Sequence, residues 1–221
     1  MKKLLHNSKI YKFGFTLAEV LITLVIVGVV AAFTIPTLVN NTKKQEYVAG
    51  LKKANSVLSQ AVYKIGQNKG YPVGDYSFFN DVDFIDEFAK VVNVNKKCSN
   101  MIDCFGRHFS GYKWLNGAGV SAMTENNSVV TSDGQMFTHV RNFGLSFGLS
   151  GEDTSNALGR IVVDINGQKN PNQFGYDTFL FYIVDKKGIV PAGANSTSDC
   201  IANGSGQTCA AKVLKENAMN Y

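Results

Sequence analysis

The sequence predicts an α+β fold in which a long amino-terminal helix, whose first half crosses a membrane, packs on an antiparallel β-sheet. Three observations predict this fold. Residues 15–35 form a run that is apolar except for one acid. Apolar residues then recur at helical spacing as far as residue 65. Short runs rich in β-branched and aromatic residues follow from residue 128 onward, separated by turn residues.

The distribution of charge excludes several classes of protein. The chain has 221 residues and a formal net charge of +5, and four of these charges lie in the first 14 residues, at Lys2, Lys3, Lys9 and Lys12. The rest of the chain therefore carries only +1, which is too little for the basic surface of a nucleic-acid-binding protein. Hydrophobic residues at 45% and charged residues at 18% exclude a disordered tail and a polytopic membrane protein.

Residues 15–35 have the sequence FTLAEVLITLVIVGVVAAFTI. As a helix they would be about 30 Å long, which matches the hydrocarbon core of a bilayer. We expect the lysine-rich leader to stay in the cytoplasm and the long carboxy-terminal part to be exported. Glu19 is the exception in this segment, because a carboxylate in lipid is costly and needs a partner.

The junction at Gly14 resembles the amino terminus of type IV pilins and type II secretion pseudopilins. The residues that carry the resemblance are a short basic leader ending in Gly14, then Phe15, Thr16-Leu17, Glu19 and an apolar helix that reaches Pro36. The resemblance implies cleavage after Gly14 by a prepilin peptidase and N-methylation of Phe15. It also implies that Glu19 pairs with the terminal amine of a neighbouring homologous subunit, on an assembly platform in the bacterial inner membrane.

This interpretation divides the chain into a leader (1–14), a transmembrane and assembly helix (15–36) and an extracytoplasmic pilin-like domain (37–221). The function would be that of a structural subunit of a type II secretion pseudopilus or a type IV pilus. The alternative is an ordinary signal peptide cut after Val30-Ala31-Ala32, which would release a soluble ligand- or surface-binding domain. The acid inside the apolar run favours the pilin interpretation.

A second alternative is a competence pilin that contacts DNA. The only local basic cluster that could serve it consists of Lys96, Lys97, Arg107 and Lys113. With so small a net charge outside the leader, this cluster is better interpreted as a solvated face, and nucleic acid is not an expected partner.

Helical spacing continues beyond the membrane segment. The apolar stripe consists of Tyr47, Leu51, Ala54, Leu58, Ala61 and Ile65, and lysines flank it. Such an amphipathic helix should lie against an apolar surface of the same chain. Pro36 removes one helical hydrogen bond and predicts a bend, whereas Gly66 and Gly70 are stop signals. The whole helix should have about 50 residues and a length of about 75 Å.

Later elements are shorter. Residues 80–94 predict a helix with Asn80 as its cap. Ser132-Asp133-Gly134 predicts the turn of a hairpin, and residues 160–165 and 178–184 are the strongest strands. Gly188 marks a further turn, and we expect the remainder to be strands.

The four cysteines are expected to form disulfides, because the domain would be exported to an oxidising compartment. Four cysteines allow three pairings, and the sequence cannot select one. Proximity favours Cys98–Cys104 and Cys200–Cys209. The family resemblance supports the second pair, since many pilins close a carboxy-terminal loop with a disulfide. A zinc site with His108 is disfavoured by the spacing.

Residues 164–177 form an oxygen-rich loop between the two strongest strands. One interpretation is a long hairpin in which Asn and Gly supply left-handed positions. The other is a calcium site, with Asp164, Asn166 and Asp177 as ligands, because calcium prefers oxygen donors. The stretch also resembles a motif near the carboxy terminus of pseudopilin-like proteins, some of which bind calcium there. No other cofactor is expected.

Two short motifs resemble enzyme signatures. Residues 144–148 read GxSxG, but that nucleophile elbow requires a later histidine, and the last one is His139. Residues 117–122 read GxGxxA without the strand that a dinucleotide site needs before it. The sequence therefore predicts a protein that is not an enzyme.

Overall fold

The computed structural model describes residues 14–80, 83–105, 111–120, 127–140 and 157–221. The chain divides into two compact units, Met1–Thr42 and Lys43–Tyr221. Helix α1 (Leu17–Lys69) contributes to both units. We describe each unit by itself.

In the first unit, the apolar side chains of α1 are exposed, as a membrane-spanning segment requires. Among the described residues, α1 is the one helix that is long and apolar enough to cross a bilayer by length and composition. The helix continues through Pro36. The bend expected at Pro36 stays a prediction.

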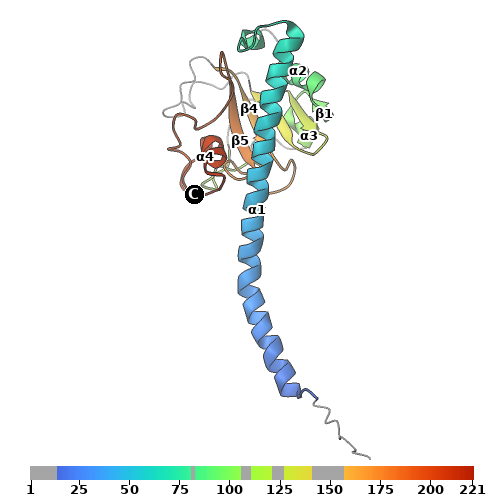
Figure 1. Cartoon of the computed structure of the whole chain (residues 1–221), viewed down its shortest axis with the longest axis vertical. Helices are drawn as coiled ribbons and strands as arrows, with labels where there is room; N and C mark the ends of the chain where they lie inside the picture. The colour runs from blue at the N-terminus through green and yellow to red at the C-terminus, as the bar shows by residue number, and fades with distance from the viewer. Residues whose placement is uncertain (1–13, 81–82, 106–110, 121–126, 141–156) are drawn as a thin grey trace, which may run out of the picture. The chain divides into compact units, whose positions relative to one another are not determined.

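The second unit contains a six-stranded antiparallel sheet whose strands pair in chain order (Figure 1). The strands are β1 (Val94–Cys98), β2 (Ser128–Thr131), β3 (Met136–Val140), β4 (Ala157–Asp164), β5 (Thr178–Val184) and β6 (Gly188–Pro191). The expected hairpin joins β2 and β3, with Gly134 at a φ of 86° in its turn. The two strongest predicted strands are neighbours, β4 and β5. The α+β prediction is therefore confirmed.

The second half of α1 covers one face of this sheet (Figure 1). Leu51, Ala54 and Leu58 are fully buried, as the helical spacing predicts, in one cluster with Phe179 and Phe181 of β5. Burying each leucine side chain contributes about 1.5–3 kcal/mol. This stripe therefore attaches the helix to the sheet.

Gly50 of α1 faces Ile165, the residue that follows β4. A Cβ atom at Gly50 would lie 3.2 Å from the Cδ1 atom of Ile165. The turn between β2 and β3 also reaches the helix: Gln135 Nε2 donates to the Gly50 carbonyl over 3.0 Å, and Lys53 forms an ion pair with Asp133. These contacts fix the position of the helix along the sheet.

The other face of the sheet is buried as well. Its cluster contains Met136, Val162, Leu180 and Tyr182, covered by side chains that include Tyr112 and Phe174. Because both faces are buried, β5 is buried at all seven positions and shows no polar alternation.

The structure corrects several of the helix boundaries predicted from the sequence. Helix α2 (Phe84–Val91) is capped by Asp83, whose carboxylate accepts the N–H groups of Ile85 and Asp86, and not by Asn80. Asn80 belongs to a 3-10 turn, η1 (Ser77–Asn80), that precedes the helix. Gly70, at a φ of 75°, follows the last residue of α1 and is the expected stop signal.

Gly66 is not a stop, because it lies inside α1 and faces Phe78. Two short helices also replace expected strands, α3 (Met101–Phe105) and α4 (Cys209–Glu216). The carboxy-terminal residues then pack back on the unit: Lys44 donates to the Met219 carbonyl, and the Tyr221 hydroxyl donates to the Gly175 carbonyl.

Candidate functional site at the amino-terminal helix

The peptide bond between Gly14 and Phe15 precedes the helix. Residues 14–16 are not helical, and the Phe15 side chain is 90% exposed. The leader, residues 1–13, lies outside the described residues. The expected cleavage position therefore lies in open backbone two residues before the amino-terminal residue of the helix, Leu17.

Thr16 and Glu19 form a capping box at the start of α1. The Thr16 N–H and the Thr16 hydroxyl both donate to Glu19 Oε2, over 2.8 Å and 2.7 Å. The Glu19 N–H donates in return to Thr16 Oγ1 over 3.2 Å. The pattern Thr-x-x-Glu before an apolar run is the sequence signal for this motif, which the sequence analysis missed.

Glu19 is the only ionisable side chain between residues 15 and 42. The later threonines of this segment do not need outside partners, because their hydroxyls donate to carbonyl oxygens of the same helix. Glu19 is therefore the one group whose charge would need compensation in lipid.

The structure contains two disulfides in the second unit, Cys98–Cys104 and Cys200–Cys209. Cys200 and Cys209 are fully buried, and the bond joins the carboxy-terminal loop to the first residue of α4. The Asp199 carboxylate also accepts hydrogen bonds from the N–H groups of Ser205 and Gln207. This polar loop is thus held by a covalent bond and a carboxylate.

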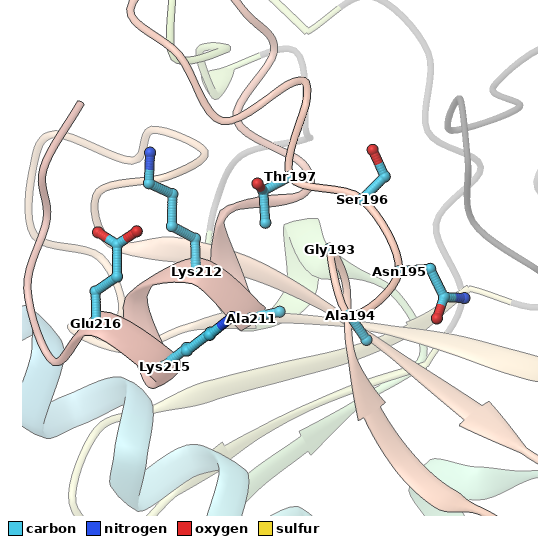
Figure 2. Close-up of a pocket in the computed structure, with 9 residues that line it drawn as sticks. All are labelled: Gly193, Ala194, Asn195, Ser196, Thr197, Ala211, Lys212, Lys215 and Glu216. Atoms are coloured by element: carbon cyan, nitrogen blue, oxygen red, sulfur yellow. The ribbon is translucent and has the colours of Figure 1, made fainter.

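A hollow of about 290 Å³ lies between this loop and α4 (Figure 2). Its lining consists of Gly193, Ala194, Asn195, Ser196, Thr197, Ala211, Lys212, Lys215 and Glu216. Lys212 and Glu216 rise from the same side of α4, opposite Thr197, while Asn195 points away from them (Figure 2). The lining contains no histidine, cysteine or aromatic side chain. It offers no aromatic surface on which a base or sugar ring could stack.

The loop between β4 and β5 brings Asp164, Asn166 and Asp177 together. Both carboxylates are fully buried. Asp177 accepts four hydrogen bonds, from the N–H groups of Asn172 and Gln173, from Asn166 Nδ2 and from the Thr178 hydroxyl. Asp164 accepts the Tyr112 hydroxyl over 2.8 Å and the Asn166 N–H over 3.2 Å. Burial raises the pKa of both carboxyl groups, well above the usual range for Asp164.

The oxygen atoms of this loop do not fit a calcium site. A calcium ion needs six to eight oxygen ligands whose lone pairs point at it, and the acceptor positions of Asp177 are all taken by protein donors. The side-chain oxygens of Asn166 and Asn172 are buried without a hydrogen-bond partner, but two amide oxygens do not make a site. No group of three metal-binding acids, histidines or cysteines occurs among the described residues. The calcium interpretation made from the sequence is therefore untested, and the hydrogen bonds of the loop argue against it.

We expect calcium to leave the stability of the domain unchanged. The midpoint of thermal unfolding should be the same in excess calcium chloride and in excess EDTA, because the loop carboxylates are already satisfied by the chain. Magnesium chloride at equal ionic strength is the control. A higher midpoint in calcium alone would show that the loop rearranges to bind the ion.

The other sites considered from the sequence lie partly or wholly outside the described residues. The GxSxG stretch, Arg107 and His108 lie outside the described residues, as does the end of the GxGxxA stretch. Gly117 and Ala118 lie in a tight turn, which is closed by a 2.8 Å hydrogen bond from the Trp114 N–H to the Ala118 carbonyl. Of the basic cluster, Lys97 forms an ion pair with Asp86 over 2.7 Å, and Lys96 donates to the Asp103 carbonyl. Half of that cluster is therefore engaged within the chain.

Comparison with known proteins gives one match. Residues 11–35 match the family described as the prokaryotic N-terminal methylation motif. No curated protein and no solved structure matches the chain. The matched range contains the Gly14–Phe15 bond, the capping box and the apolar part of α1 as far as residue 35. The motif implies processing by a prepilin peptidase and assembly with other pilin subunits. The chain therefore carries at residues 11–35 the methylation motif that is the signal of type IV pilins and pseudopilins.

Proposed function

We propose that the chain is a structural subunit of a filament, either a type II secretion pseudopilus or a type IV pilus. The observation that carries the proposal is Glu19, a lone acid near the start of an exposed apolar helix and inside the matched motif. In this proposal the leader is removed after Gly14, Phe15 is methylated, and the subunit waits in the inner membrane with its second unit outside the cytoplasm. The buried disulfides of that unit suit an oxidising compartment.

Assembly follows from the pairing of charges. Cleavage creates an ammonium group at Phe15, four residues before Glu19 in the chain. Either charge alone in an apolar surrounding costs several kcal/mol, and pairing them between neighbouring subunits lowers this cost. Subunits that dock in the correct register satisfy both groups, whereas a shifted register leaves both without a partner. A single carboxylate can therefore set the stagger between subunits on the assembly platform.

The mature amino terminus tests this proposal. Mass spectrometry of the protein from membranes should find a chain that begins at Phe15 and carries the mass of one added methyl group. A chain that begins at Phe33 and is recovered outside the membrane would instead identify an exported soluble domain. A prepilin peptidase deletion strain is the control, since it should leave the leader attached.

A further inference from the structure

Thr16 differs from the other threonines of the apolar segment in what its hydroxyl does. The hydroxyls of Thr23, Thr34, Thr37 and Thr42 donate to backbone carbonyls three or four residues earlier, at 2.9–3.4 Å. They are satisfied within the helix and suit a lipid surrounding. The Thr16 hydroxyl donates instead to the carboxylate of Glu19 over 2.7 Å. Its partner is therefore the one charged group of the segment.

In the capping box, the two carboxylate oxygens of Glu19 have different surroundings. Both donors of Thr16, the N–H and the hydroxyl, reach the same oxygen, Oε2. Among the described residues, Oε1 accepts no hydrogen bond. A carboxylate has about four acceptor positions, so the box leaves Oε1 available to a donor from outside the chain.

We propose that Thr16 is a positioning residue for assembly: it holds Glu19 through Oε2 and presents Oε1 to the terminal amine of the neighbouring subunit. This inference rests on the proposed filament function. A free glutamate side chain loses rotamer freedom when it is fixed in a contact. The box fixes it before the neighbour arrives, which is preorganisation of the binding group. Because Thr16 caps the helix at its amino-terminal end, Phe15 lies before the helix.

The test uses the full chain in cells that assemble the filament, with three variants. Thr16→Val removes the hydroxyl at nearly constant volume, whereas Thr16→Ser keeps it. Thr23→Val is the matched control, since it removes a hydroxyl of the same segment that donates only to the Val20 carbonyl. The measured quantities are leader removal, the amount of subunit in the membrane, and the ratio of sheared filament to membrane subunit.

Thr16→Val should lower the filament ratio about ten- to a hundredfold, the size expected for loss of a hydrogen bond to a charged group. Leader removal and the membrane level should stay unchanged, and Thr16→Ser and Thr23→Val should assemble like the natural chain. A purely structural role for Thr16 would instead impair leader removal or the membrane level, and that result would overturn the inference. Normal assembly of Thr16→Val would also overturn it, as would a loss in Thr16→Ser as large as in Thr16→Val.

Glu19→Ala separates this inference from the proposed function. If Glu19→Ala assembles normally, the proposed role of the carboxylate fails, and the role of Thr16 fails with it. If Glu19→Ala fails to assemble while Thr16→Val assembles normally, only the inference about Thr16 fails.

Discussion

Replacing Glu19 with alanine is expected to abolish filaments while leaving a processed, membrane-inserted subunit. The change removes the partner of the terminal ammonium group of the neighbouring subunit and leaves that charge unpaired in an apolar surrounding. Breaking a buried ion pair in this way costs about 3–5 kcal/mol. A loss of this size at each contact reduces assembly more than about a hundredfold, since each 1.4 kcal/mol is a factor of ten. The measurement is the ratio of sheared filament to membrane subunit.

Glu46→Ala is the matched control for this variant. Glu46 is an exposed acid on the same helix, beyond the apolar segment. It should assemble normally, and both variants should lose the leader and unfold at the same temperature as the natural chain. Filaments of normal abundance from Glu19→Ala would show that the carboxylate does not pair subunits.

Replacing Asp177 with asparagine is expected to destabilise the second unit by about 3–5 kcal/mol. The amide N–H₂ group that replaces one carboxylate oxygen leaves two buried hydrogen-bond donors without an acceptor, and each costs about 1–3 kcal/mol. The N–H₂ group also points its own hydrogens at these donors. Each carboxylate oxygen accepts one backbone N–H, so either orientation of the amide meets an N–H group, of Asn172 or of Gln173. A loss of this size is a large share of the 5–15 kcal/mol that stabilises a typical domain. Chemical unfolding followed by circular dichroism measures it.

Asp164→Asn is the matched control, since the Tyr112 hydroxyl can reverse from donor to acceptor. Asp164→Asn should change the free energy of unfolding little at neutral pH, and it should alter how that free energy depends on pH. Burial raises the pKa of Asp164 in the folded state, so its contribution to stability is fully present below the unfolded pKa, about 4. That contribution is lost as the pH rises through the folded pKa. The natural chain should lose stability over this window, and the variant should lose less. Equal destabilisation by both substitutions would contradict the hydrogen-bond assignment.

The sequence predicts the features that depend on periodicity and on single unusual residues. The helical stripe, the β2–β3 hairpin and the pair of strong strands follow from apolar spacing and turn residues. Glu19 stands out because no other charge occurs near it in the chain. The helix stop at Gly70 could be predicted because its left-handed backbone favours glycine.

Other features depend on partners that a sequence does not display. The oxygens of residues 164–177 suggested a calcium site, but the N–H donors that occupy Asp177 come from the backbone, whose direction depends on the folded loop. Helix α4 forms where the stretch after Cys209 can bury Ala210 and Val213, which is a tertiary effect. The Thr16–Glu19 box can be detected from its spacing, whereas the family resemblance draws attention to the acid only as a partner for another subunit.

The order of the strands has a consequence for how the second unit folds. Each strand pairs with the one made just before it, and the helix that covers the sheet is made before all of them. In the proposed topology, which keeps the leader in the cytoplasm, the residues nearest α1 emerge first, and the chain can therefore add one hairpin at a time to a surface already present. Only the last segment, which holds α4 and Cys209, has to arrive before the final covalent closure. This order of assembly suits the proposed export of the second unit, because each part of the sheet can form as it emerges.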